Sequence, residues 1–334
     1  MDWQSPALTA ALEAWLAEDI GRGDLTAAAL QGQQGQAHWV AKQPGRFCGG
    51  PLVQRLFQRL DPGVSLRLLR QDGDSVEAGD CLLELRGAAT ALVAGERTAL
   101  HLAMRLSGIA TATAALVAQL EGTGVRLADT RKTTPGLRLL EKYAVRCGGG
   151  INHRMGLDDA AMLKENHIAW AGGITAAITA VREQAPWPTA VIVEAETEAQ
   201  ALEAVQAGAN GVLLDEFSPE QLTQLVPRLR DCSAGVVVLE ASGIQPEQLL
   251  AYAVTGIDLI STSAPVTRSR WLALSMRFTG RGMIRAGFPR PRTAHAQPVP
   301  VPGCPAAGGD ATGLPGSRCG AGPPVGPCQQ AGIR

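Results

Sequence analysis

Between residues 125 and 264, short apolar runs alternate with longer stretches that have the periodicity of amphipathic helices. Strands that are apolar on both faces are typical of parallel sheets, because helices cover both faces of such sheets. One intervening helix has clear boundary signals, with Ser218 as N-cap, Pro219 in the first turn and Gln221 three residues after the cap. The alternation therefore predicts a parallel sheet covered by helices. The apolar runs are 125–129, 161–164, 190–194, 211–215, 236–240 and 258–262.

Several of these runs end in a residue with a functional side chain, namely Asp129, Lys164, Glu194, Asp215 and Glu240. In parallel α/β barrels the carboxyl ends of the strands form the active-site face. One polar residue at such a position is readily explained as a loop cap. Because successive runs end this way, we expect the side chains to share one site.

The stretch from residue 129 to residue 167 is rich in cations, glycines and hydroxyl groups. Its cations offer many hydrogen-bond donors and, apart from a neutral imidazole, no acceptors. If the fold brings them together, they require a ligand with several negative charges, because unpaired clustered cations repel one another and lose hydration. The alternative is a solvated basic face, which does not need a Thr-Arg-Lys-Thr-Thr-Pro-Gly segment at a strand end. The cations are Arg131, Lys132, His153, Arg154 and Lys164.

The composition is that of a globular protein, with 46% hydrophobic and 18% charged residues. A net charge of −1 and an aromatic content of 4% give no indication of a nucleic-acid partner. The seven cysteines lack C-x-x-C spacing, so we expect reduced thiols in a cytoplasmic protein. The N-terminus lacks the regions of a signal peptide and no apolar run has the length of a membrane span, so we expect no membrane partner.

The N-terminal part mixes helices and strands. Leu8, Leu12 and Leu16 have helical spacing, which predicts an amphipathic helix over residues 6–19. Residues 72–80 are similar to the hairpins of lipoyl carrier domains, but the carrier lysine is missing, which favours an ordinary turn. Further strands are expected at 36–42, 64–69, 81–85 and 271–278, and further helices at about 50–60 and 89–120.

Three motifs together carry a resemblance to a known family: Asp129–Gly136, Asn152–Arg154 and Lys164–His167. With them the chain resembles the quinolinate phosphoribosyltransferases, also called nicotinate-nucleotide pyrophosphorylases (carboxylating), over about residues 6–280. Segments 18–26 and 96–111 support the resemblance independently.

The resemblance implies an α/β fold with two parts. It assigns residues 1–117 to an N-terminal α/β sandwich domain and 118–264 to an incomplete parallel α/β barrel of about six or seven strands. Residues 265–286 would return to the N-terminal domain, and the composition of 287–334, rich in Pro and Gly, predicts a disordered tail. The family also implies a homodimer, with a hexamer as the alternative, in which each site is capped by the partner's N-terminal domain.

The family joins quinolinate to 5-phosphoribosyl 1-pyrophosphate with Mg²⁺, giving nicotinate mononucleotide, pyrophosphate and carbon dioxide for NAD biosynthesis. The resemblance implies catalytic roles for Lys132, Lys164, Glu194 and Asp215. It also implies that Glu194 and Asp215 hold Mg²⁺ through water or substrate oxygens, and that a neighbouring subunit supplies Arg97. The implied substrate-binding residues are Arg97, Thr130, Arg131, Lys132, His153, Arg154, Lys164, Glu194, Asp215, Ser242, Gly243, Ser263 and Ala264.

The chain departs from the family pattern at Ile192, Glu216, Ile244 and Ser263, all on the expected phosphoribosyl side of the site. The segment Thr262–Pro265 also occurs in a molybdenum-transport-associated relative of the family. This leaves an alternative function, the binding of an oxyanion such as molybdate or of another phosphorylated ligand. The intact Asn-His-Arg motif favours the enzyme.

Overall fold

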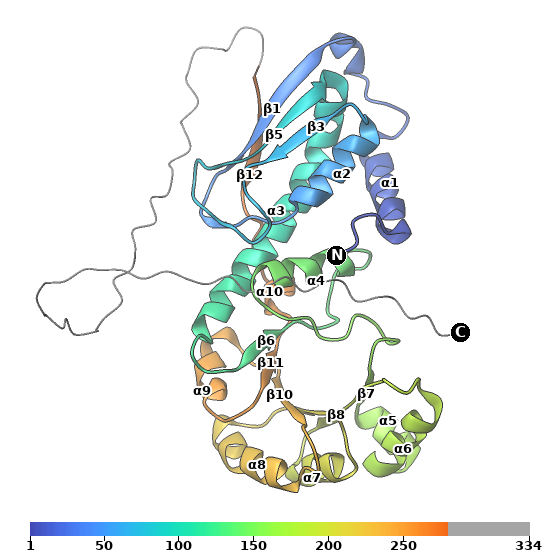
Figure 1. The fold of residues 1–334 in the computed structure, drawn as a ribbon, viewed down its shortest axis with the longest axis vertical. Coiled ribbons are helices and arrows are strands. Elements are labelled where there is room, and N and C mark those ends of the chain that lie inside the picture. The colour runs from blue at the N-terminus through green and yellow to red at the C-terminus, as the bar shows by residue number, and fades with distance from the viewer. Residues whose placement is uncertain (280–334) are drawn as a thin grey trace, which may run out of the picture. The chain divides into compact units, whose positions relative to one another are not determined.

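The computed structural model describes residues 1–279. The N-terminal half of this range, together with the last strand of the described chain, forms an antiparallel sheet with helices packed on it. The strand order is β12-β1-β5-β3, so the last strand of the described chain lies beside the first (Figure 1). Ala37 of β1 is opposite Phe278 of β12 in an antiparallel register. The strands are β1 (Gln34–Ala41), β3 (Ser65–Leu68), β5 (Cys81–Ala88) and β12 (Leu274–Phe278), with a separate two-stranded ribbon of β2 (Gly45–Arg46) and β4 (Ser75–Val76).

The helices of this half cover the sheet with the apolar faces that the sequence predicts. Leu8, Leu12 and Leu16 of α1 are all buried, as their spacing indicates. Trp39 of β1 and Phe57 of α2 are fully buried in the same core. The helices are α1 (Pro6–Ile20), the 3-10 turn η1 (Ala27–Leu30), α2 (Gly50–Leu60) and the long α3 (Ala89–Gln119).

The second half is a six-stranded parallel sheet in the order β6-β11-β10-β9-β8-β7. The outer strands β6 and β7 are not paired with each other, and beside β6 only a single bridge joins Ala128 to Ile151. The predicted incomplete α/β barrel is therefore confirmed. The strands are β6 (Arg126–Ala128), β7 (Ala161–Leu163), β8 (Val191–Ala195), β9 (Gly211–Leu214), β10 (Val238–Ser242) and β11 (Leu259–Ser261).

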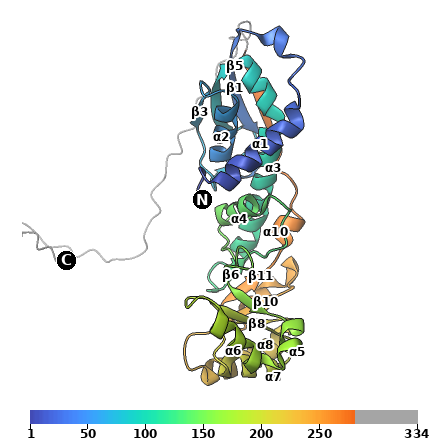
Figure 2. The ribbon, with the colours of Figure 1, turned by 90° about the vertical axis from the view of Figure 1, so that its right-hand side faces the viewer.

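The helices between the barrel strands lie outside the strands (Figures 1 and 2). The predicted start of α8 is confirmed, since the Ser218 hydroxyl accepts a hydrogen bond from the Gln221 amide and Pro219 opens the helix. The helices between the strands are α4 (Arg138–Cys147), α5 (Glu165–Ala171), α6 (Ile174–Gln184), α7 (Glu198–Gln206), α8 (Pro219–Cys232) and α9 (Leu249–Ala253) with the 3-10 turn η2 (Pro246–Gln248). The short helix α10 (Ala264–Thr267) follows the last barrel strand, β11.

Helix α3 is long and apolar enough to cross a membrane, but half of its most apolar window is buried inside the protein. Its first part packs in the core of the N-terminal half, and Leu116 near its end packs in the core of the barrel. Gly108 permits close packing, because a Cβ there would lie 2.2 Å from the carbonyl oxygen of Arg270. The helix is therefore a core element that links the two halves.

Two sequence predictions need comment. Strand β10 was expected at 236–240 but runs Val238–Ser242, because its register with β9 pairs Val238 with Gly211. Glu240 consequently lies inside the strand, buried, and does not end it. The predicted disordered tail, 287–334, lies outside the described residues.

Candidate active site

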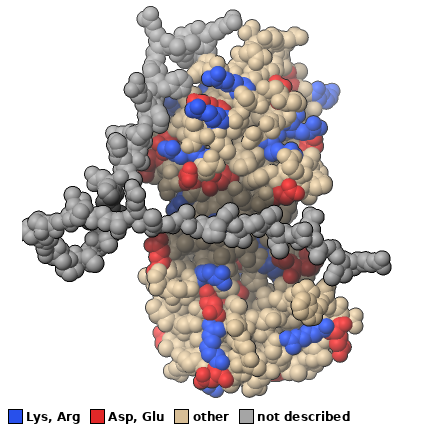
Figure 3. Space-filling view, in the orientation of Figure 1, with Lys and Arg blue, Asp and Glu red and all other residues tan. Residues whose placement is uncertain are grey.

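A cavity of about 760 Å³ opens at the carboxyl ends of the barrel strands. Every barrel strand contributes to it, from the Thr130–Lys132 segment after β6 to the Thr262–Ala264 segment after β11. All the predicted substrate-binding residues line this cavity except Arg97, which lines a second cavity of about 410 Å³ with Trp15, Glu18 and Asp19. On the face drawn in Figure 3, basic and acidic side chains are interspersed.

A buried ion pair fixes the loop that carries His153 and Arg154. Asp129 and Lys142 pair with each other, and their side chains are only 1% and 0% exposed. The Asp129 carboxylate also accepts hydrogen bonds from the Asn152 side chain (2.6 Å) and the His153 amide (2.8 Å), and Lys142 donates to the His153 carbonyl (2.9 Å). Burial raises the pKa of Asp129 even though Lys142 favours its ionised form. Asp129 therefore does not face the cavity but positions residues that do.

The tautomer of His153 follows from its two partners. Its Nδ1 accepts a hydrogen bond from the Arg154 amide at 2.8 Å, so Nε2 carries the proton in the neutral ring. Nε2 lies 3.2 Å from Oε2 of Glu240. The buried Glu240 thus orients the imidazole at the cavity wall.

The two arginines of the site are poised for an anion. Arg154 donates to the Ala160 carbonyl at 2.9 Å, and its pKa is lowered by burial and by the nearby charge of Arg131. The Nε of Arg131 is buried and has no hydrogen-bond partner within residues 1–279. A buried unpaired donor beside a second cation is costly unless a ligand satisfies it. The geometry therefore fits a carboxylate or phosphate between the two side chains.

A second buried acid holds the Thr133–Thr134 turn. Glu141, fully buried, accepts hydrogen bonds from the Thr134 amide and hydroxyl, both at 2.8 Å. It also pairs with Arg105 at 2.8 Å. The Arg105 side chain is only 16% exposed and ends on Glu141.

Two acidic groups, Glu194 and Asp215, also line the cavity. Glu194 pairs with Lys164, and the Ser242 hydroxyl donates to the Asp215 carboxylate. Carboxylate oxygens are the donors that Mg²⁺ prefers. Within residues 1–279, no third His, Cys, Asp or Glu completes a metal site with Glu194 and Asp215. These two residues fit Mg²⁺ only if a substrate or water supplies the remaining oxygens.

The loops after β10 and β11 form the last part of the wall. Gly243 has a left-handed backbone (φ 74°), which a glycine adopts without strain. Arg268 also lines the cavity and donates to the Gln245 side chain at 2.9 Å. Sequence reasoning missed Arg268, Lys142 and Glu141, since none of them belongs to a recognisable motif.

The four residues at which the chain departs from the family pattern differ in whether they line the cavity. Glu216 and Ser263 line the cavity, as does Ile244, although its side chain is buried in the barrel core. Ile192 lies within β8 and does not line the cavity. Glu216 has a positive φ of 59°, which is unusual for a residue other than glycine.

Fold and site together define an α/β-barrel enzyme with a cavity suited to a small polyanion. Residues 24–107 match the N-terminal domain of quinolinate phosphoribosyl transferase, and residues 109–277 match its C-terminal domain. The chain belongs to the quinolinate phosphoribosyltransferase family, whose members are pentosyltransferases.

Individual relatives agree with this assignment. The chain is 46% identical to a probable nicotinate-nucleotide pyrophosphorylase (carboxylating) of Synechocystis sp. over 268 residues, covering 80% of this chain and 90% of the relative. It is 38% identical to the nicotinate-nucleotide pyrophosphorylase (carboxylating) of Homo sapiens, covering 76% and 86% of the two chains. The crystal structure of NadC from Streptococcus pyogenes superposes with a TM-score of 0.77 at 38% identity, covering 81% of this chain and 96% of that one.

Proposed function

We propose that the cavity joins quinolinate to 5-phosphoribosyl 1-pyrophosphate and releases pyrophosphate, carbon dioxide and nicotinate mononucleotide. The observation that carries the proposal is the unpaired, buried donor of Arg131 beside Arg154, in the cavity that Glu194 and Asp215 also line. Quinolinate has two neighbouring carboxylates, one of them on the carbon next to its nucleophilic ring nitrogen. The side of the cavity with Arg131 and Arg154, the cationic wall, therefore suits the charge of quinolinate. The side with Glu194 and Asp215, the acidic wall, suits the hydroxyls of a ribose.

On the cationic wall, the side chains bind and orient the ring. Arg131 and Arg154 match carboxylate oxygens through guanidinium forks, while Lys132 and Lys164 act as point charges. This holds the ring nitrogen toward the anomeric carbon of the sugar, which is catalysis by positioning and by charge. His153, which Glu240 holds in place, lines this side of the cavity and does not transfer a proton to the quinolinate ring in the proposed reaction.

On the acidic wall, Glu194 and Asp215 face the sugar as it loses pyrophosphate. The ribose carbon becomes positively charged as the leaving group departs, and the two carboxylates stabilise that charge. Mg²⁺ bound at Glu194 and Asp215 would offset the charge of the pyrophosphate. The Ser242–Gly243 and Ser263–Ala264 segments are proposed to bind the 5-phosphate through backbone N–H groups. The carboxylate on the ring carbon next to the nitrogen then leaves as carbon dioxide, because the positive charge of the quaternised nitrogen stabilises the electron pair left on that carbon, which takes up a proton.

Arg97 requires a second subunit in this proposal. It lies outside the main cavity, exposed on α3 beside His101, in the cavity that also contains Glu18 and Asp19. We therefore propose a homodimer in which the N-terminal domain (1–117) of one subunit supplies Arg97 to the barrel (118–264) of the other. Mixing Arg97→Ala and Lys132→Ala proteins tests this. Restored activity in the mixture supports supply in trans, and continued inactivity contradicts it. A cytoplasmic location is part of the same proposal.

The reaction is tested with purified protein, quinolinate, phosphoribosyl pyrophosphate and Mg²⁺. Formation of nicotinate mononucleotide is expected, and its absence refutes the proposal. Arg131→Ala and Arg154→Ala should each weaken quinolinate binding by about 2–5 kcal/mol, as for other desolvated charge pairs. Arg126→Ala is the matched control, because Arg126 is exposed at the amino end of β6, away from the cavity. The molybdate alternative is not favoured, since the relatives have carboxylating pyrophosphorylase names.

A further inference from the structure

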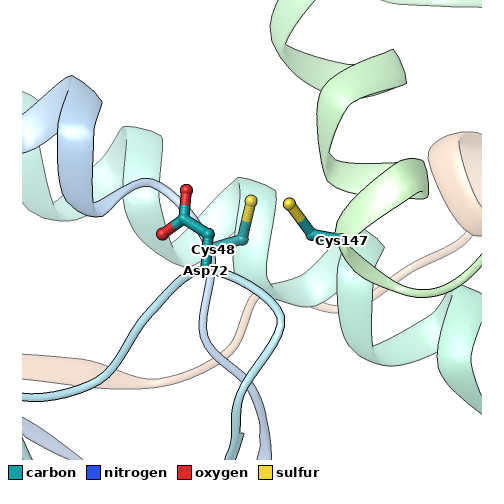
Figure 4. A group of neighbouring side chains, drawn as sticks. All are labelled: Cys48, Asp72 and Cys147. Atoms are coloured by element: carbon teal, nitrogen blue, oxygen red, sulfur yellow. The ribbon is translucent and has the colours of Figure 1, made fainter. Parts of the chain in front are cut away.

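Two cysteines from distant parts of the sequence meet outside the active-site cavity. Cys48 precedes α2 and Cys147 ends α4, and Figure 4 shows the sulfur of Cys147 directed toward that of Cys48. Their sulfurs and a carboxylate oxygen of Asp72 all lie within 4.8 Å of one another. Cys48 is completely buried, while Cys147 is partly exposed. Of the two residues, Cys147 is therefore the less buried.

Asp72 already has a structural role in this group. Its Oδ1 accepts hydrogen bonds from the amides of Gly49 (2.9 Å) and Gly50 (2.8 Å), which open helix α2. Its Oδ2 accepts a hydrogen bond from the Tyr143 hydroxyl at 2.8 Å. The carboxylate is thus a helix cap that also ties α4 to the N-terminal half. These hydrogen bonds explain the presence of Asp72, but they do not explain why two thiols lie beside it.

The backbones that carry the thiols are closely packed. Gly73, next to Asp72, has φ +94°, and a Cβ there would lie 3.1 Å from the Cys147 carbonyl oxygen. A Cβ on Gly148 would lie 2.5 Å from the Ala110 carbonyl oxygen. The turn after Asp72 therefore packs directly against the backbone of Cys147, and the next residue, Gly148, packs directly against α3.

We propose that Cys48 and Cys147 are an oxidative modification site, which forms a reversible disulfide on exposure to hydrogen peroxide. The Cys147 thiolate attacks one peroxide oxygen, the O–O bond breaks, and hydroxide leaves and is protonated to water. This gives a sulfenic acid on Cys147. The Cys48 sulfur then attacks the Cys147 sulfur, the S–O bond breaks, and the hydroxyl leaves as water with the Cys48 proton. The two thiols lose two electrons and the peroxide gains them, and an added thiol reductant reverses the change by exchange.

The electrostatics of the pair assign these roles. A hydrogen bond from Cys48 lowers the pKa of Cys147, which favours the thiolate at the less buried position. Burial raises the pKa of Cys48 and keeps it as a neutral thiol. A disulfide is neutral, so its formation leaves no charge in the buried space. A bound soft metal ion would instead require both sulfurs to ionise beside the Asp72 carboxylate, which is the less favourable use of the site.

The disulfide would connect the N-terminal half to the helix that supports the active site. Cys147 ends α4, which also carries Lys142 and Glu141. The cross-link would limit separation of the two halves in the unfolded chain, so the oxidised protein should have a higher unfolding temperature than the reduced protein.

Peptide mapping of the full chain tests the proposal. The reduced protein is treated with hydrogen peroxide, remaining thiols are alkylated, and trypsin is added without reductant. Cleavage after Arg46, Arg55, Arg146 and Arg154 isolates each cysteine in its own peptide, 47–55 and 147–154. The expected result is one disulfide-linked pair of these two peptides, lost again after dithiothreitol. The exposed Cys232 should not join either of them.

Variants separate the proposal from general oxidation. Cys48→Ala should stop the reaction at a Cys147 sulfenic acid, trapped by dimedone, and Cys147→Ser should leave Cys48 reduced. Cys232→Ser is the matched control and should form the linked pair as before. If peroxide links either cysteine to another one instead, or leaves both as thiols while Cys232 is oxidised, the proposal is overturned. Stoichiometric zinc in the purified protein that protects both thiols from alkylation would also overturn it and indicate a metal site.

Discussion

Replacing Lys142 tests whether the buried Lys142–Asp129 pair stabilises the loop that carries His153 and Arg154. The Lys142 side chain is 0% exposed and pairs with Asp129, which is 1% exposed. We expect Lys142→Met to lower the free energy of unfolding by about 3–5 kcal/mol, because it leaves the Asp129 charge buried without its counter-charge. Whole domains have only about 5–15 kcal/mol of stability, so this loss is large. The variant also removes the hydrogen bond to the His153 carbonyl, so quinolinate affinity should fall as well.

The pH dependence of this variant gives a second measurement. Burial already raises the pKa of Asp129 with Lys142 present, and the loss of Lys142 should raise it further. A carboxyl group with a raised pKa binds its proton more tightly in the folded state than in the unfolded state. Stability therefore falls as pH rises between the two pKa values. The defect of Lys142→Met should accordingly shrink as the pH is lowered from neutral toward about pH 5.

Urea denaturation of Lys142→Met, Asp129→Asn and the double variant measures the pair directly. Each single change leaves one buried charge, whereas the double change removes both, so the double variant should lose much less than the sum of the singles. Calorimetric titration with quinolinate reports the effect on the His153 loop. Additive losses, or a loss below about 1 kcal/mol for Lys142→Met, would refute the reasoning, because they fit an ordinary exposed pair.

Other predictions concern single residues. Glu141→Ala should lower the unfolding free energy by about 3–5 kcal/mol, since it leaves Arg105 and the Thr134 amide without their partner. A loss of less than about 1 kcal/mol in urea denaturation would contradict this. Glu216→Asn should raise it by about 0.5–1 kcal/mol, because asparagine tolerates the left-handed backbone better, and any loss of stability in the same assay would count against strain at this position. Thr197→Ala should cost about 1 kcal/mol through loss of the α7 N-cap, and an unchanged denaturation midpoint would show that the cap contributes nothing.

The sequence predicted the barrel well because parallel strands are apolar on both faces and recur with helices between them. The same pattern placed Lys164 and Asp215 correctly at the cavity, since a polar residue directly after a buried strand faces the carboxyl edge of the sheet. The N-terminal helix was equally clear from its leucine spacing. These features depend on the spacing of apolar and polar residues along the chain, which can be read from a single sequence.

The supporting residues could not be predicted in this way. Lys142 lies in a helix whose sequence gives no sign that its ammonium group is buried, and its partner Asp129 is in a different element. Arg105 and Glu141 meet across two helices that only the tertiary packing of α3 and α4 brings together. Burial of a charge depends on its partner, and partners distant in sequence leave no periodic signal.

Glu240 shows how a correct functional signal can come with the wrong structural reason. The sequence singled it out as the end of a strand, yet β10 extends to Ser242, so Glu240 lies inside the strand and reaches His153 from there. Its Oε1 has no hydrogen-bond partner within residues 1–279, whereas Oε2 is close to the imidazole. A strand residue that is polar and buried must have a partner or be costly. The polarity of position 240 therefore indicated a site, but only the register of β10 determined that the residue contacts His153 from within the strand.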